Sequence, residues 1–241
     1  MGNITPAVGG EPTEPAYIAG QDQSLGRVVA VGSIDLNRAI SDFSNRAGND
    51  AKNYYILAPG EGVISTGLDD DIMAPDLPSC ADTTSNQCRD TDDVPDYWRV
   101  SGTSFSAPYV AGALALMLQT FPNLKDKPEV ALQILLDTAD DYVDPDLDPI
   151  TGTAAGEGVD EVSGVGILNL IRAFSPQGQQ TLDFGAEKVS IDTALAPSGG
   201  AFGDWASSSG AFNGLVFQDR YERGFVCLLY TSPSPRDQAK S

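Results

Sequence analysis

The stretch "SGTSFSAPYVAGALALM", Ser101 to Met117, decides the fold of this chain. Ser104 stands just before a run of apolar residues, with Pro108 near its start. The run predicts a helix that ends at Pro122, because proline cannot continue a helix interior. A helix that is apolar on every face is typical of the centre of a large core. We therefore expect this helix to be buried.

The position of Ser104 suits nucleophilic chemistry. The first N–H groups of a helix lack intrahelical partners, and the helix dipole favours negative charge there. When the Ser104 hydroxyl attacks a carbonyl, the N–H of Ser104 can donate to the oxyanion that forms. Gly102 permits a tight approach, and Pro108 suits a first helical turn. The simpler alternative is a serine that only caps a core helix.

The composition narrows the class of protein. The chain has 241 residues, enough for one large α/β domain or two small ones. It contains 14 Lys and Arg against 34 Asp and Glu, a formal net charge of −20. Phosphate recognition needs clustered cations, so nucleic acid is excluded as an expected partner. No apolar run is long enough to span a bilayer.

Strand and helix signals alternate along the chain. Arg27 to Asp35 is a β-branched run that predicts a buried strand, and Tyr54 to Thr66 predicts two strands around a Pro-Gly turn. Pro128 and Glu129 predict the start of another helix. Gly164 to Phe174 predicts a short strand or turn that leads into a last core helix. This order predicts an α/β fold.

An acidic segment and two cysteines lie between these elements. Cys80 and Cys88 bound a short polar stretch that fits a local disulfide, worth roughly 2–3 kcal/mol in the chain-entropy model. Such a bond implies an oxidising compartment; two free thiols are the alternative. Calcium is possible at the clusters Asp69 to Asp96 or Asp140 to Asp148. Neither has EF-hand spacing, so solvated loops are the preferred interpretation.

The composition changes after Phe174. We place a domain boundary near Pro176 to Gln180, followed over residues 177–226 by a linker with β-strand pieces. Residues 227–237 can be back-translated into a sequencing-library adapter, and we expect residues 227–241, which include Cys227, to be an artefact.

The residues around Ser104 resemble the nucleophile segment of subtilisin-like serine peptidases. The matching positions are Gly102, Thr103, Ser104, Pro108 and Gly112. The segments "VVAVGSID", "SDFSNRAG", "LAPGEGVIST" and "GVGILNLIRAF" also follow the family's order, so the resemblance covers about residues 2–174. It implies a three-layer α/β fold with a mostly parallel sheet, whose N-terminal half is missing, in residues 1–176. It also implies a serine endopeptidase that acts on proteins or peptides and requires no cofactor.

The resemblance also suggests a second oxyanion donor. In the family an Asn side chain in an Ala-Gly-Asn turn takes this role, and Gly2 and Asn3 stand at a suitable separation here. We carry the role to Asn3. An ordinary turn asparagine is the alternative.

The chain contains no histidine. In subtilisins the triad runs Asp, His, Ser along the sequence, and both partners precede the oxyanion Asn. The resemblance therefore implies an Asp and a His upstream of residue 1. We expect this chain alone to be inactive, because a lone triad member leaves only residual catalysis.

Two alternatives remain open. Sedolisin-type peptidases also use a Ser-Gly-Thr-Ser segment, but pair the serine with Glu and Asp and bind calcium. The second alternative is a catalytically dead subtilisin-like domain that serves as a binding or surface module.

The extension after residue 176 suggests a cellular location for the protein. Phe202 to Val226 resembles the stretch that joins the peptidase to an outer-membrane barrel in bacterial autotransporter subtilisins. Its anchors are Phe202-Gly203-Asp204 and Asp219-Arg220-Tyr221. The resemblance implies a secreted or cell-surface protein with a possible barrel beyond this chain. A generic β-rich extension is the alternative.

Overall fold

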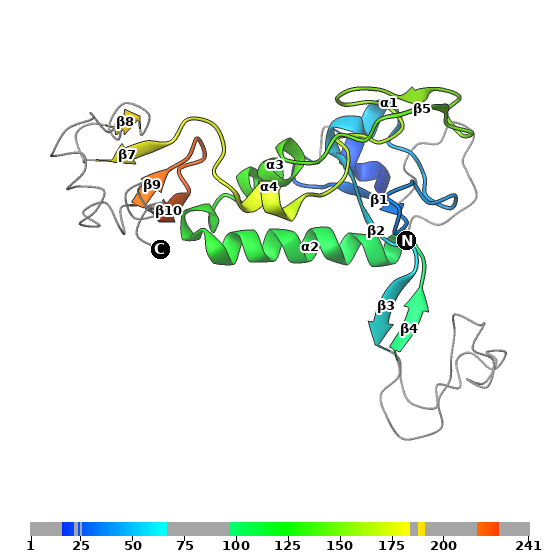
Figure 1. Ribbon diagram of the computed structural model, residues 1–241, viewed down its shortest axis with the longest axis horizontal. Coiled ribbons are helices and arrows are strands. Elements are labelled where there is room, and N and C mark those ends of the chain that lie inside the picture. Colours follow the sequence, from blue (N-terminus) through cyan, green and yellow to red (C-terminus); the bar gives the residue numbers. More distant parts are fainter. Residues whose placement is uncertain are drawn as a thin grey trace, which may run out of the picture.

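The computed structural model describes residues 16–21, 24, 26–66, 97–183, 188–190 and 216–226. Its α-helices are α1 (Gly48–Ala51), α2 (Thr103–Thr120), α3 (Pro128–Asp137) and α4 (Leu170–Phe174). Its strands are β1 (Ala30–Ile34), β2 (Tyr55–Pro59), β3 (Val63–Thr66), β4 (Tyr97–Val100), β5 (Asp144–Leu147), β6 (Ala154–Ala155), β7 (Thr181–Asp183), β8 (Lys188–Ser190), β9 (Val216–Gln218) and β10 (Gly224–Val226). This mixture confirms the expected α/β class (Figure 1).

The centre of the fold is the parallel pair β1 and β2. Their register joins Ala30 to Tyr55 and Ile34 to Pro59. Ile167 extends the pair through a parallel bridge to Leu57. Among the described residues the other ladders are antiparallel: β3 with β4, β5 with β6, and the sheet β10-β9-β7-β8. Both β1 and β2 are largely buried, as their apolar sequences predict.

Tyr55 explains two glycines of this central region. Its hydroxyl donates to the Asn45 carbonyl oxygen at 2.5 Å, and the side chain passes across β1. A Cβ at Gly32 would lie 1.9 Å from the Tyr55 hydroxyl oxygen, and one at Gly164 would lie 2.4 Å from the Tyr55 carbonyl oxygen. Only glycine leaves room for the ring and backbone of Tyr55 at these two positions.

Tyr55 makes the stability of the chain depend on alkaline pH. Burial raises the pKa of its hydroxyl to about 12, against a smaller lowering by the Ser44 hydroxyl. The unfolded chain ionises Tyr55 near pH 10, whereas the folded chain keeps the proton, so stability is complete below pH 10 and is lost towards pH 12. We expect a loss of roughly 2–3 kcal/mol from this group, from about 1.4 kcal/mol per pKa unit.

Denaturant unfolding at several pH values checks this expectation. Tyr55→Phe should remove this part of the loss above pH 10, while costing about 1 kcal/mol at neutral pH for the hydrogen bond to Asn45. Equal slopes for the two proteins between pH 10 and 12 would contradict the assignment to Tyr55.

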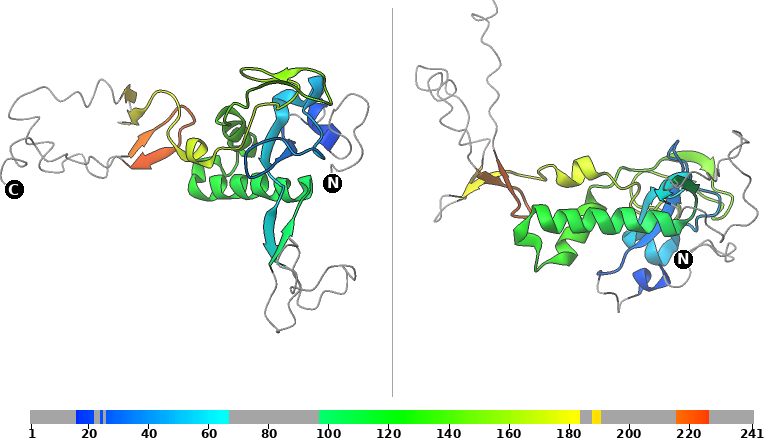
Figure 2. Two further views of the ribbon diagram at one scale, coloured as in Figure 1. Left: turned by 45° about the vertical axis from the view of Figure 1, so that its right-hand side comes forward. Right: turned by 90° about the horizontal axis from the view of Figure 1, so that it is seen from below.

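The main core lies between α2, α3 and β2. It is lined by Ile56, Ala58, Val110, Ala113, Met117, Leu124, Ala131, Ile134 and Leu135. Helix α3 begins at Pro128, as predicted, and turns one apolar face into this core. Helix α2 runs along one side of the molecule, with the β3–β4 hairpin at its N-terminal end and the β7–β10 strands near its C-terminal end (Figures 1 and 2).

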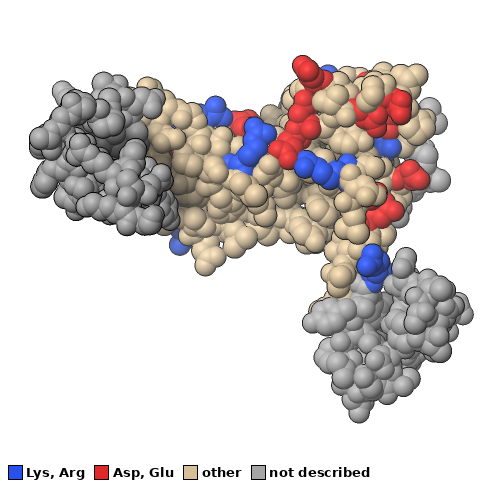
Figure 3. Space-filling model, viewed as in Figure 1, with Lys and Arg blue, Asp and Glu red and all other residues tan. Residues whose placement is uncertain are grey.

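The expectation that α2 is buried all round is wrong for the described structure. Only Thr103, Ser106, Val110, Ala113 and Met117 are buried along it. The opposite stripe, which runs from Ser104 through Pro108, Ala111 and Ala115 to Gln119, is exposed. Helix α2 carries no charged residue, and its side of the molecule shows a broad uncharged surface (Figure 3). An apolar sequence alone does not fix which elements pack against each face of the helix.

Helix α4 is also less buried than predicted. It has five residues, of which Ala173 is buried, whereas Ile171 is 83% exposed. The four strands β7 to β10 lie within residues 177–226, where strand pieces were predicted. The domain boundary near residues 176–180 stays a prediction.

Candidate active site

Ser104 is the second residue of α2 and is exposed to solvent. Gly102 precedes the helix with φ 150° and ψ 150°, a backbone conformation essentially restricted to glycine. The Gly102 N–H donates to the Gly60 carbonyl oxygen at 2.7 Å, and the Phe105 N–H donates to the Gly102 carbonyl oxygen at 2.9 Å. These bonds fix the turn that presents Ser104 at the positive end of the helix dipole.

Gly60 packs against this turn. A Cβ at Gly60 would lie 2.0 Å from Ser106 Oγ and 2.6 Å from Ser33 Oγ. The Pro-Gly turn between β2 and β3 therefore packs directly against the first turn of α2. The sequence predicted a turn at this glycine, but the close contact with Ser106 comes from the packing.

Buried hydroxyl groups lie beneath the start of α2. Ser33 Oγ lies 2.9 Å from Ser41 Oγ, and the Ser33 N–H donates to Ser44 Oγ at 2.9 Å. Thr103 Oγ1 and Ser106 Oγ are buried and have no hydrogen-bond partner within the described part of the chain. Sequence reasoning missed this arrangement, because small polar residues carry little signal of burial.

A pocket of about 480 Å³ lies next to the segment that precedes the N-terminal end of α2. It is lined by Asp35, Leu36, Asn37, Glu61, Gly62, Arg99 and Ser101. The Gly62 N–H donates to Ser101 Oγ at 3.0 Å and so ties the start of β3 to the segment before the helix. The pocket combines two acidic side chains with one arginine, and its lining includes no residue of α2.

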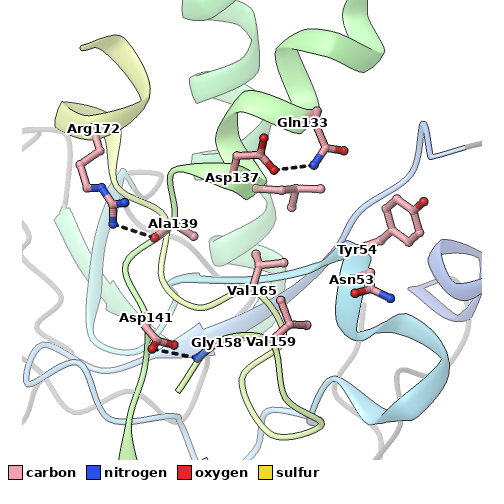
Figure 4. A pocket seen from close by; sticks show the side chains of 11 residues that line it. Asn53, Tyr54, Gln133, Asp137, Ala139, Asp141, Gly158, Val159, Val165 and Arg172 are labelled. Atoms are coloured by element: carbon pink, nitrogen blue, oxygen red, sulfur yellow. Dashed lines mark hydrogen bonds between the residues drawn. The ribbon is translucent and has the colours of Figure 1, made fainter. Parts of the chain in front are cut away.

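A second pocket, of about 510 Å³, is lined by the end of α3, by the segments that follow it, and by Asn53 and Tyr54 just before β2 (Figure 4). Its polar groups bond to one another: Gln133 donates to Asp137 at 2.7 Å, and the Gly158 N–H donates to Asp141 at 3.0 Å. No residue of α2 lines it. Its volume therefore gives no reason to place the chemistry there.

Several predicted residues lie outside the described residues. Asn3 is one of them, and so are Cys80 and Cys88. The acidic cluster Asp69 to Asp96 and the anchor Phe202-Gly203-Asp204 lie outside as well. The oxyanion role of Asn3 and the disulfide therefore stay predictions, and of the two site residues the structure places Ser104.

Two carboxylates of the second acidic cluster, Asp140 and Asp148, are bound by arginines. Arg46 pairs with Asp148 at 2.6 Å with both side chains buried, and Arg38 pairs with Asp140 at 2.8 Å. Burial raises the pKa of Asp148, but the Thr151 N–H and Arg46 outweigh it and hold the pKa below its usual value. The hydrogen bond from Asn169 is the main cause that lowers the pKa of Asp140.

Calcium binding at the two acidic clusters stays a prediction. Within the described ranges, no group of three or more His, Cys, Asp or Glu residues is placed to hold a metal ion.

In the same ranges, no helix has the length and hydropathy needed to cross a membrane.

A family model and several known proteins match this chain. The model of the subtilase family matches residues 1–166. Over 112 residues the chain is 32% identical to the major intracellular serine protease of Bacillus subtilis. This alignment covers 45% of this chain and 26% of that protein. It is 30% identical over 164 residues to serotype-specific antigen 1 of Mannheimia haemolytica, covering 67% of this chain and 13% of that protein.

A solved structure is also similar. MycP1 from Mycobacterium smegmatis shares 28% identity over 68% of this chain and 32% of its own, with a TM-score of 0.43. The chain thus spans about a quarter or less of the two curated relatives and about a third of this solved chain.

Proposed function

The chain belongs to the subtilase family, and from this premise we propose that Ser104 is the nucleophile of a serine endopeptidase that cleaves protein or peptide substrates. The observation that carries the proposal is the exposed position of Ser104 in the first turn of α2, directly after Gly102. A solvated hydroxyl at the positive end of a rigid helix is accessible to substrate and favours the negative charge that develops during attack.

The proposed mechanism follows from this placement. Ser104 Oγ attacks the scissile carbonyl carbon and gives its proton to an imidazole, and the carbonyl oxygen becomes an oxyanion. The N–H of Ser104 and the side chain of Asn3 donate to that oxygen. The imidazolium protonates the leaving amine, and water then hydrolyses the acyl-enzyme by the same route in reverse.

The imidazole has to come from outside this chain. None of the 241 residues is histidine, so we propose that the base comes from other residues of a longer protein, together with the Asp partner that precedes it in the family's chain order. The exposed stripe of α2 agrees with this. Beyond Ser104 it continues through Pro108 and Ala111 to Ala115, an apolar surface on which the rest of a peptidase domain would pack.

Labelling with a fluorophosphonate probe tests the proposal. We expect the longer protein to be labelled at Ser104, as located by mass spectrometry of its peptides. We expect the 241-residue chain to remain unlabelled over the same time, because no base activates its serine. Ser104→Ala in the longer protein is the matched control and should remove the label.

Two results would contradict the proposal. Rapid labelling of Ser104 in the 241-residue chain would mean that its own residues activate the serine without a histidine. A longer protein that contains the Asp and His but neither reacts nor cleaves peptides would favour the dead binding module.

We further propose that the intact protein is exported and is of the autotransporter type. The similarity to a protein named as a serotype-specific antigen, over two thirds of this chain, supports a surface location. The similarity to a protease named as intracellular covers less of the chain. The mass of the Cys80–Cys88 peptide pair before and after reduction tests export, since a disulfide forms in an oxidising compartment.

A further inference from the structure

Arg223 is the largest fully buried side chain among the described residues. It lies at the end of the turn between β9 and β10, in the extension. Its guanidinium pairs with Asp219 at 2.7 Å, and both side chains are completely buried. The same nitrogen, Nη2, also donates to the Ser175 carbonyl oxygen at 2.9 Å, and Nη1 donates to the Ala173 carbonyl oxygen at 2.5 Å. A buried arginine is tolerated only when its charge and donors are satisfied in this way.

The contacts of Arg223 join the ends of two helices. Ala173 and Ser175 are at the C-terminal end of α4, where carbonyl groups lack intrahelical partners. The guanidinium also lies over the ring of Phe121, which caps the C-terminal end of α2, at 4.8 Å from the ring centre. A cation is favoured at a helix C-terminus, because the dipole is negative there.

Neighbouring residues of the same turn reach a third helix end. Arg220 pairs with Asp137, the last residue of α3, at 2.8 Å, and the Tyr221 hydroxyl donates to the same carboxylate at 2.5 Å. Asn123, just beyond α2, donates to the Glu222 carbonyl oxygen at 2.9 Å. The hairpin therefore contacts the C-terminal ends of α2, α3 and α4.

We propose that residues 216–226 are a latch that binds these three helix ends and makes the extension part of the same folding unit as the peptidase segment. Its recognition chemistry is two arginines against the negative ends of helices, with Phe217 and Phe225 stacked at 5.6 Å beside Phe121. Ser104 lies in the first turn of α2, and the latch contacts the opposite, C-terminal end of the same helix. The latch itself requires no peptidase activity.

Hydrogen–deuterium exchange on the 241-residue chain tests the latch. In the wild-type chain we expect the amides of β9 and β10 to be protected together with those of α2. Arg223→Met leaves Asp219 buried without its partner. It should lower the melting temperature by about 10 °C and raise exchange at the C-terminal ends of α2, α3 and α4 together. Arg38→Met removes an exposed pair with Asp140 and is the control, with little expected change.

A second measurement keeps the proposal testable if Arg223→Met does not fold. A protease site is introduced between residues 191 and 215 of the otherwise wild-type chain, and the cut protein is analysed by size-exclusion chromatography. The latch predicts that the C-terminal fragment elutes with the rest. Release of that fragment, or fast exchange of β9 and β10 in the wild-type chain while α2 stays protected, would overturn the proposal.

Discussion

Replacement of Ser104 by alanine in the longer protein should lower kcat for peptide hydrolysis by about 10⁶-fold, the loss known for the nucleophile of subtilisin. The reason is that every later step of the proposed mechanism needs the acyl-enzyme on this oxygen. Stability should change by less than about 0.5 kcal/mol, because Ser104 is exposed and its truncation leaves no cavity.

The measurement is kcat with a peptide substrate, together with a denaturant melt of each variant. Ser175→Ala serves as the control, since its half-buried side chain donates to the Ile171 carbonyl oxygen at the C-terminal end of α4 and takes no part in the proposed mechanism. We expect the control to keep the wild-type kcat. Retention of more than about a hundredth of the activity by Ser104→Ala would refute the role of Ser104 as nucleophile.

Gly166→Ala is expected to have the largest effect on folding, about 4 kcal/mol or more in the free energy of unfolding. Gly166 has φ +101°, and an added Cβ would lie 2.1 Å from the Asp140 carbonyl oxygen. Backbone strain and a clash with backbone therefore add at one position. The clash would also break the two backbone hydrogen bonds, each 2.7 Å long, by which the N–H of Asp140 and of Ile167 each donate to the other residue's carbonyl oxygen.

Gly152→Ala is the matched control for this substitution. Gly152 has φ +75°, but nothing lies within 4 Å of an added Cβ. Its cost should be the conformational one alone, about 1–2 kcal/mol. Urea unfolding of both variants separates the two contributions, and equal losses would show that the contact with Asp140 does not matter.

The sequence predicted the elements that local signals define. Pro122 and Pro128 indicate the end of α2 and the start of α3, and the structure confirms both. The Pro-Gly turn separates β2 from β3, as expected. The motif around Ser104 identified the family, because glycine, proline and serine there meet strict backbone requirements.

The remaining features depend on contacts between distant segments. Nothing in the local sequence shows that Arg223 is fully buried while Arg220, three residues earlier, is half exposed. The apolar run of α2 likewise predicts burial without specifying which elements cover each face. The close contact of Gly60 with Ser106 needs the relative positions of the β2–β3 turn and the helix. These are tertiary effects, which propensity and periodicity do not contain.

The β3–β4 hairpin has a consequence for how this protein can diverge. Its pairing joins Val63 to Val100 and Thr66 to Tyr97, so both ends of residues 67–96 are fixed next to each other. The entropy of closing a chain segment grows slowly with length, by about 0.6 kcal/mol for each doubling. Insertions or deletions between Thr66 and Tyr97 would therefore cost little and leave the approach to Ser104 in register.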